Sequence, residues 1–198
     1  MGLSLIVLAA GLSRRMGLEN KLLLPLGGQT ILGVTVDHAL SAGLGEVIVV
    51  VGHESEDVRR ALVGKELVRV VENERFDLGM TTSIQTGVLA SSLSSIGYMI
   101  CLSDMPFIVE EEYRALGEAF LRFYVLDERV ILIPAFGGVP GNPVVFSSFY
   151  REVILGHGNM EGCRGILQVN KRYVRVFEMG SGSVLWDIDS REDYLRVV

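Results

Sequence analysis

Several features that define other classes of protein are scarce in this sequence of 198 residues. Only two cysteines are present, Cys101 and Cys163, and such a pair is more typical of reduced, buried thiols than of a disulfide framework. The apolar stretch 3–10 ends after eight residues at Gly11, and the arginines follow it rather than precede it. This order argues against a secretory signal, and the length falls far short of the ~20 residues of a spanning helix.

Positive charge is also in the minority, because 18 Lys and Arg face 24 Asp and Glu and the net charge is −6. A broad electrostatic footprint for nucleic acid or for a membrane surface is therefore not expected, although a small basic pocket is compatible with this balance. We expect a cytoplasmic protein that acts on small molecules.

What the sequence has in abundance is apolar residues, at 49% of the chain. This composition excludes intrinsic disorder, and a chain of this length buries a core without a disulfide or metal. No Pro/Gly/Ser-rich linker, charge block or repeat divides the chain, so we predict one domain over 1–198.

The hydrophobic pattern alternates between short apolar runs and helical periodicity. Buried strands are predicted over 4–9, 46–51, 67–72 and 98–102, and helices over 29–42, 55–63, 80–92 and 109–124. Thr81, Thr82 and Ser83 are good N-cap residues for the third of these helices. The less regular second half adds strands over 130–134, 143–146 and 173–177 and helices over 149–155, 163–169 and 191–197. The fold class predicted is α/β, an open, mostly parallel Rossmann-like sheet with helices on both faces and ligands at the carboxyl ends of the strands.

The first strand leads into a loop with the features of a phosphate-binding site. The segment Leu8-Ala-Ala-Gly-Leu-Ser-Arg-Arg-Met-Gly17 has small residues at the strand exit, and Arg14, Arg15 and Lys21 add positive charge. Small residues allow backbone amides to approach an anion. The spacing matches neither a Walker loop nor a Gly-x-Gly-x-x-Gly motif. The alternative is a strand-to-helix turn with ordinary surface arginines.

Carboxylates at two other places have the position of metal ligands. Asp104 lies just past the strand 98–102, after Ser103, and Asp187 and Asp189 share one face if their segment is extended. A Mg²⁺ ion on substrate phosphates needs few protein carboxylates, since water and phosphate oxygens fill the other positions. Alternatively, Asp104 caps the next helix or closes an Asx turn, and Asp189 is the N-cap of the last helix.

Taken together, these motifs resemble the MobA-like nucleotidyltransferases, especially the molybdenum cofactor cytidylyltransferases. The resemblance includes the loop 8–17 with Lys21-Leu-Leu-Leu-Pro25, Gly79-Met-Thr-Thr-Ser-Ile84, Leu102-Ser-Asp-Met-Pro106, the turn 137–146 and Asp187-Ile-Asp-Ser-Arg-Glu-Asp193. It implies a nucleotide-diphospho-sugar-transferase-like fold whose N-terminal half binds NTP and whose C-terminal half binds the acceptor.

The resemblance also implies roles for individual residues. Arg15, Lys21 and Asp104 would be catalytic, and Asp104 with Asp187 or Asp189 would bind Mg²⁺. The nucleotide would contact Leu8, Ala9, Ala10, Gly11, Arg15, Lys21, Gly79, Thr82 and Ser83. The acceptor would contact Gly141, Asn142, Pro143 and Arg164.

The reaction implied is attack of an acceptor phosphate on the α-phosphate of an NTP, with release of pyrophosphate. Cytidylyl relatives have Ala where guanylyl relatives have Gly at the position of Ala10, which favours CTP. The resemblance to the molybdenum cofactor cytidylyltransferases implies a molybdopterin-type acceptor. The alternatives are a guanylyl- or another pyrimidine nucleotidyltransferase acting on a sugar or polyol phosphate, and a non-catalytic module that delivers the finished cofactor. A transient molybdoenzyme or chaperone partner is compatible with the leading hypothesis and with the delivery module.

Overall fold

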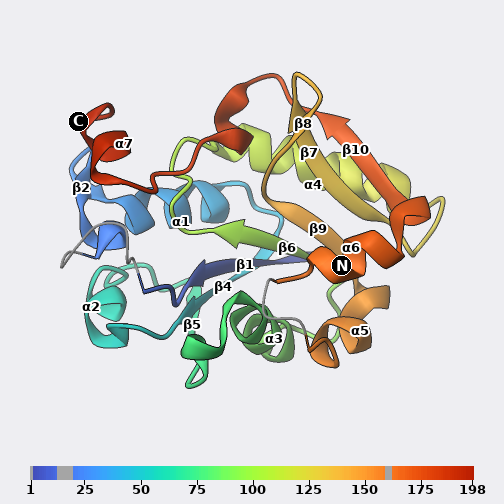
Figure 1. The fold of residues 1–198 in the computed structure, drawn as a ribbon, viewed down its shortest axis with the longest axis horizontal. Coiled ribbons are helices and arrows are strands. Elements are labelled where there is room, and N and C mark those ends of the chain that lie inside the picture. Colours follow the sequence, from blue (N-terminus) through green and yellow to red (C-terminus); the bar gives the residue numbers. More distant parts are fainter. Residues whose placement is uncertain (1, 13–19, 159–161) are drawn as a thin grey trace.

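The computed structural model describes residues 2–12, 20–158 and 162–198. A central sheet separates two layers of helices (Figure 1). The strand order in the described part of the chain is β10-β7-β9-β6-β1-β4-β5, with β8 paired to β7 at the side. The strands of this sheet are β1 Leu3–Ala9, β4 Gly45–Val51, β5 Val68–Glu72, β6 Gly97–Leu102, β7 Ile131–Phe136, β8 Val139–Pro140, β9 Val144–Ser147 and β10 Val174–Glu178.

The sheet is mostly parallel, as predicted. β1 pairs in parallel with both β4 and β6, β4 pairs in parallel with β5, and β10 with β7. β9 is antiparallel to its two neighbours, β6 and β7. From β5 at the edge the chain crosses back to β6 on the other side of β1, so the strand order reverses between β1 and β6. A ligand crevice is expected at the carboxyl ends of strands at such a switch point.

The helices are α1 Ile31–Ser41, α2 Ser55–Arg60, α3 Met80–Ala90, α4 Glu110–Tyr124, α5 Arg151–Leu155, α6 Arg164–Val169 and α7 Arg191–Leu195. α1 and α4 lie on one face of the sheet, and α3 and α5 on the other (Figure 1). The terminal α7 lies beside the small hairpin of β2 Pro25–Leu26 and β3 Gln29–Thr30, where the Tyr194 hydroxyl donates to the carbonyl of Pro25 at 2.8 Å.

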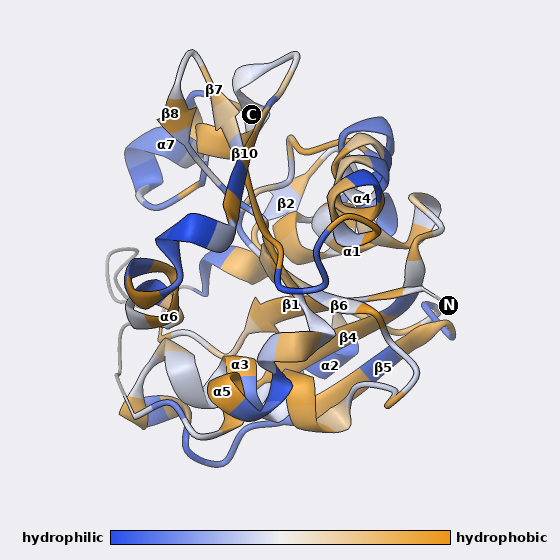
Figure 2. Ribbon diagram, turned by 90° about the vertical axis from the view of Figure 1, so that its right-hand side faces the viewer, coloured by the Kyte–Doolittle hydropathy of each residue, from blue (hydrophilic) through white to orange (hydrophobic). Residues whose placement is uncertain are grey.

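Alternation along the strands divides the core into two layers. In β1, Leu5 and Val7 face the layer of α1 and α4, whereas Ile6 faces the layer of α3, and all three are fully buried. Hydrophobic colour therefore dominates the central strands (Figure 2). Because both faces are covered, these strands are continuous apolar runs, and for this reason the sequence revealed them.

The start of α1 and the N-caps of α3 and α7 differ from what the sequence suggested. α1 begins at Ile31, because the preceding residues form β3 and Thr30 caps the helix by accepting from the Gly33 amide at 3.0 Å. The N-cap of α3 is Gly79, at φ 101°, so Thr81, Thr82 and Ser83 lie inside the first turn. The N-cap of α7 is Ser190 and not Asp189. The Asp189 side chain instead contacts the Lys21 ammonium at 2.8 Å.

Among the described residues, none of the helices combines the length and the apolar character required to cross a membrane.

Candidate active site

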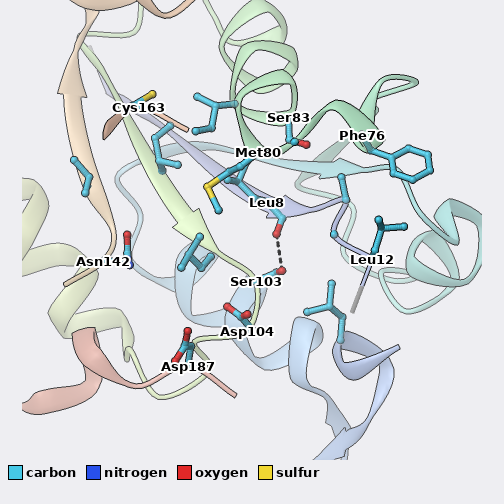
Figure 3. Close-up of a pocket in the computed structure, with 18 of the residues that line it drawn as sticks. Leu8, Leu12, Phe76, Met80, Ser83, Ser103, Asp104, Asn142, Cys163 and Asp187 are labelled. Carbon is cyan, nitrogen blue, oxygen red and sulfur yellow. Dashed lines mark hydrogen bonds between the residues drawn. The ribbon is translucent and has the colours of Figure 1, made fainter. Parts of the chain in front are cut away.

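A cavity of about 860 Å³ opens at the carboxyl ends of β1 and β6. Figure 3 shows Phe76 and Leu12 at one end of it and Cys163 and Asn142 at the other, with Asp104 and Asp187 along one side. The cavity thus lies at the switch point of the sheet, and it is lined by residues from both halves of the chain.

Hydrogen bonds fix the backbone where β1 and β6 end. The Ser103 hydroxyl donates to the carbonyl of Leu8 at 2.6 Å, the contact drawn in Figure 3. The Thr35 hydroxyl lies 3.1 Å from the carbonyl of Ser103 and ties this corner to α1. These contacts hold the loop that carries Asp104.

Three carboxylates converge on one side of the cavity. Asp104, Asp187 and Asp189 each offer one oxygen, and these three atoms lie within 4.8 Å of one another. The amide of Ile188 donates to the carbonyl of Asp104 at 2.9 Å, and the Ile188 side chain is fully buried. With Ile188 anchored inward, the residues on either side of it present their carboxylates to Asp104.

The ammonium of Lys21 joins this group. Its Nζ lies 2.5 Å from Asp104 Oδ2 and 2.8 Å from Asp189 Oδ1. Lys21 is positioned by a short 3₁₀ helix, Lys21–Leu23, whose N-cap Asn20 accepts from the Leu22 amide at 3.1 Å. Burial alone would lower the pKa of Lys21, but the two carboxylates outweigh it and the pKa is raised, so the side chain is a cation at neutral pH.

The negative charge of the third carboxylate, Asp187, is less well compensated than the charges of Asp104 and Asp189. Burial, together with the charges of Asp189 and Asp104, raises the pKa of Asp187 above its usual value. Oδ1 of Asp104 is buried and has no hydrogen-bond partner among the described residues. Buried carboxylate oxygens without a donor are the ligands that a hard divalent cation prefers, so the three side chains fit such an ion.

A family model for the MobA-like NTP transferase domain matches residues 5–176, which include both strand ends and Lys21. The chain belongs to this family. It is a nucleotidyltransferase. The family assignment agrees with the resemblance drawn from the motifs.

Two relatives match this NTP transferase along nearly its full length. The molybdenum cofactor cytidylyltransferase of Escherichia coli K12 is 24% identical, and the purine catabolism protein PucB of Bacillus subtilis 168 is 31% identical, each over 96% of this chain and 92% of the relative. Among solved structures, a nucleotidyl transferase from Methanothermobacter thermautotroptrophicus superposes with a TM-score of 0.83 at 29% identity, covering 99% of this chain and 95% of that one. The complex of Rv0371C from Mycobacterium tuberculosis H37Rv with manganese gives 0.76 at 25%, covering 100% and 98%.

The end of the cavity far from Phe76 has an apolar wall. Side chains from β6, β9, α3, α6 and the residue before α6 form it, namely Ile84, Ile100, Val144, Phe146, Cys163 and Leu167. Burial raises the pKa of Cys163 to about 12, so this thiol is neutral near pH 7 and belongs to the apolar wall. Asn142, at this end in Figure 3, and Arg164, which directly follows Cys163, are polar residues of the lining.

At the Phe76 end of the cavity, the start of α3 is held by Asn73, a residue that the sequence motifs did not predict. The buried Asn73 amide donates to the hydroxyls of Thr82 at 2.9 Å and Ser83 at 3.0 Å. The Thr82 hydroxyl in turn lies 2.8 Å from the carbonyl of Arg75 and 2.9 Å from that of Gly79. Thr82 therefore supports the start of the helix, while Gly79 and Ser83 line the cavity.

Most of the residues singled out in the sequence meet at this cavity. Those that line it are Leu8, Ala10, Gly11, Lys21, Gly79, Ser83, Asp104, Asn142, Arg164, Asp187 and Asp189. Ala9, Thr82, Gly141 and Pro143 do not line it, although each is adjacent in sequence to a residue that does, and Arg15 lies outside the described residues. The sequence reading also missed Phe76 and the apolar wall, because apolar residues in buried elements carry no signal of a cavity.

Proposed function

We propose that this chain transfers CMP from CTP to a phosphorylated pterin of the molybdopterin type and releases pyrophosphate, with Mg²⁺ as the metal. The observation that carries the proposal is one cavity in which three carboxylates and Lys21 lie next to an apolar wall. The E. coli relative, a molybdenum cofactor cytidylyltransferase, supports the same reaction.

The nucleotide would occupy the end formed by the N-terminal half of the chain. Ala10, Leu12 and Phe76 provide a surface for the base, and the start of α3 presents backbone amides at its positive end. Lys21, next to the carboxylates, is within the same lining and would reach the phosphates. The acceptor would then lie at the Cys163 end, formed largely by the C-terminal half.

The chemistry is a displacement at phosphorus. An oxygen of the acceptor phosphate forms a bond to the α-phosphorus of CTP, the bond from that phosphorus to the bridging oxygen breaks, and pyrophosphate leaves with the electron pair. Bound at Asp104, Asp187 and Asp189, Mg²⁺ would supply positive charge to the phosphates. Lys21 would neutralise charge that develops on the α-phosphate, and the cavity walls would hold the two substrates in line.

The apolar wall favours a heterocyclic acceptor over a sugar or polyol phosphate. Hydroxyl groups of a sugar need hydrogen-bond partners when they are desolvated, and each one left unpaired costs about 1–3 kcal/mol. A flat ring system would instead bury its faces against Ile100, Val144 and Phe146. Arg164, which lines the cavity, would pair with the acceptor phosphate.

A turnover matrix tests the proposal. Each of the four NTPs is combined with molybdopterin, with a hexosamine 1-phosphate and with a polyol phosphate, and pyrophosphate release and product mass are measured. We expect turnover with CTP and molybdopterin, at least tenfold above every other pair. Preference for a sugar or polyol phosphate, preference for GTP, or binding of the pterin nucleotide without pyrophosphate release would each replace the proposal by the corresponding alternative.

A pair of arginine variants separates the acceptor end from the nucleotide end. Arg164→Met should raise the KM for the acceptor at least tenfold and leave the KM for CTP within about twofold, because a charge-assisted contact to phosphate is lost only at that end. Arg122→Met, which removes an exposed arginine of α4 outside the cavity, is the matched control and should change neither constant. Equal effects of the two variants would contradict the assignment of Arg164.

A further inference from the structure

In the structure the carboxylates that would hold the metal already have a cation between them. Lys21 Nζ contacts an oxygen of Asp104 and an oxygen of Asp189, at 2.5 and 2.8 Å, and only 13% of the Lys21 side chain is exposed. A divalent ion bound to the same two side chains would therefore lie within a few Å of this buried ammonium. Like charges at that distance repel strongly where water is largely excluded.

We propose that Lys21 is a counter-ion for the carboxylates that keeps a free divalent metal off them until the nucleotide arrives. This inference rests on the proposed function for the identity of the nucleotide, but not for the competition itself. The metal then enters together with the triphosphate, because the phosphates give the Lys21 ammonium a new anionic partner. Lys21 stays protonated throughout, and only its partners change.

The arrangement explains why the carboxylates need Lys21 in the free protein. Without Lys21, three carboxylates within 4.8 Å would repel one another. Oδ2 of Asp104 would also lose the Lys21 ammonium as a donor, in addition to Oδ1, which already has none among the described residues. One lysine thus serves the carboxylates in the free protein and the α-phosphate during the reaction. The Lys21 ammonium cannot contact the carboxylates and the α-phosphate at the same time, so binding of Mg²⁺ and binding of nucleotide should be strongly coupled.

Titration with Mn²⁺ in the absence of nucleotide tests the competition, with the unbound ion followed by its EPR signal. Lys21→Met removes the charge, Lys21→Arg retains it, and Lys65→Met is a matched control. The Lys65 side chain is equally shielded, at 13% exposed, and is paired with Asp37, but it lies outside the cavity lining. We expect Lys21→Met to bind Mn²⁺ at least tenfold more tightly than the unsubstituted protein, and the other two variants to stay within about threefold of it.

Equal or weaker Mn²⁺ binding by Lys21→Met would overturn the inference, as would equal tightening in Lys65→Met, which would indicate a change of net charge alone. If Lys21→Met does not fold, the unsubstituted protein carries the test. The NMR signals of the labelled Lys21 side chain, assigned by their loss in Lys21→Arg, should remain in place with Mg²⁺ alone and move with Mg²⁺ and CTP. Movement with Mg²⁺ alone would refute the competition.

The same variants distinguish this inference from the proposed function. In the turnover assay with CTP and molybdopterin, Lys21→Met should be slow although it binds metal more tightly. If the unsubstituted protein turns over this pair but Lys21→Met does not bind Mn²⁺ more tightly, only the counter-ion role is refuted. If Lys21→Met binds Mn²⁺ more tightly but the unsubstituted protein shows no turnover with molybdopterin, the counter-ion role stands and the proposed acceptor is refuted.

Discussion

Single residues at the Phe76 end of the cavity would determine how much room the base of the proposed nucleotide has. Ala10 is 4% exposed and lines the cavity. A Cβ placed on Gly52 would come within 2.9 Å of the Ala10 methyl and 2.6 Å of the Phe76 side chain, so these three residues are in close contact. The backbone of Gly52 fits there only because it has no side chain, and one added or removed methyl changes the space next to it.

Substitution of Ala10 by Gly should therefore relax the preference for CTP over GTP. We expect the unsubstituted enzyme to prefer CTP by roughly 10- to 200-fold in kcat/KM, the range that one methyl group in a tight pocket produces. Ala10→Gly should reduce this ratio severalfold, measured with the same acceptor. Ala9→Gly, at a buried position that does not line the cavity, controls for loss of strand stability and should leave the ratio unchanged. A ratio that is the same in Ala10→Gly would show that other groups select the base.

At the scale of elements, the segment 181–189 connects α4, the turn before β9 and the carboxylates. The Glu112 carboxylate on α4 accepts from the Ser181 hydroxyl at 2.5 Å and from the Ser183 hydroxyl at 2.8 Å. Further along, the amide of Asn142 donates to the carbonyl of Val184 at 2.9 Å. Trp186 stacks on Phe107 with ring centroids 4.8 Å apart. The position of Asp187 and Asp189 thus depends on contacts made well outside the cavity.

Glu112→Ala should destabilise the protein by about 1.5–5 kcal/mol. The carboxylate also accepts from the Val109 amide at 3.1 Å, and loss of such a cap costs about 0.5–2 kcal/mol. The buried Ser183 hydroxyl would lose its partner in addition, at about 1–3 kcal/mol. Urea unfolding measures the difference. Glu111→Ala, which removes an exposed carboxylate from the same helical turn, should stay within about 0.5 kcal/mol of the unsubstituted protein. Equal losses in the two variants would mean that only the helix dipole is affected.

Elements that are apolar on both faces were predictable, and contacts across the chain were not. β1 and β6 appear in the sequence as continuous apolar runs, and Asp104 was recognisable because it lies two residues past the end of β6. The pairing of Lys21 with Asp104 joins residues 83 positions apart, and no local pattern encodes it. Thr82 matched a nucleotide-binding motif, but its hydroxyl is engaged with backbone carbonyls, which only the fold reveals. Glu112 looked like an ordinary acidic residue at a helix start, since its serine partners are distant in sequence.

At the scale of the whole molecule, both halves contribute to one sheet and one cavity. β9 from the second half lies between β6 and β7 and pairs with both, so the order of strands does not divide the sheet into two separate units. The two core layers likewise include residues from both halves. A ligand that binds at one end of the cavity should for this reason stabilise the complete chain, and unfolding should be a single cooperative transition.

Thermal unfolding with Mg²⁺ and CTP tests this coupling. At a CTP concentration about 100 times the Kd in the presence of Mg²⁺, the folded state gains about 2.7 kcal/mol, which raises Tm by roughly 5–11 °C for a domain of this size. Mg²⁺ alone should raise Tm by less than about 2 °C, because Lys21 already neutralises Asp104 and Asp189. Asp104→Asn should unfold cooperatively and show little of the shift, since it removes both a carboxylate proposed to hold the metal and one of the two partners of Lys21. If scanning calorimetry resolves two transitions and only the first shifts with CTP, the N-terminal half binds the nucleotide as a separate unit. The two halves that line the cavity would then not unfold as one cooperative structure.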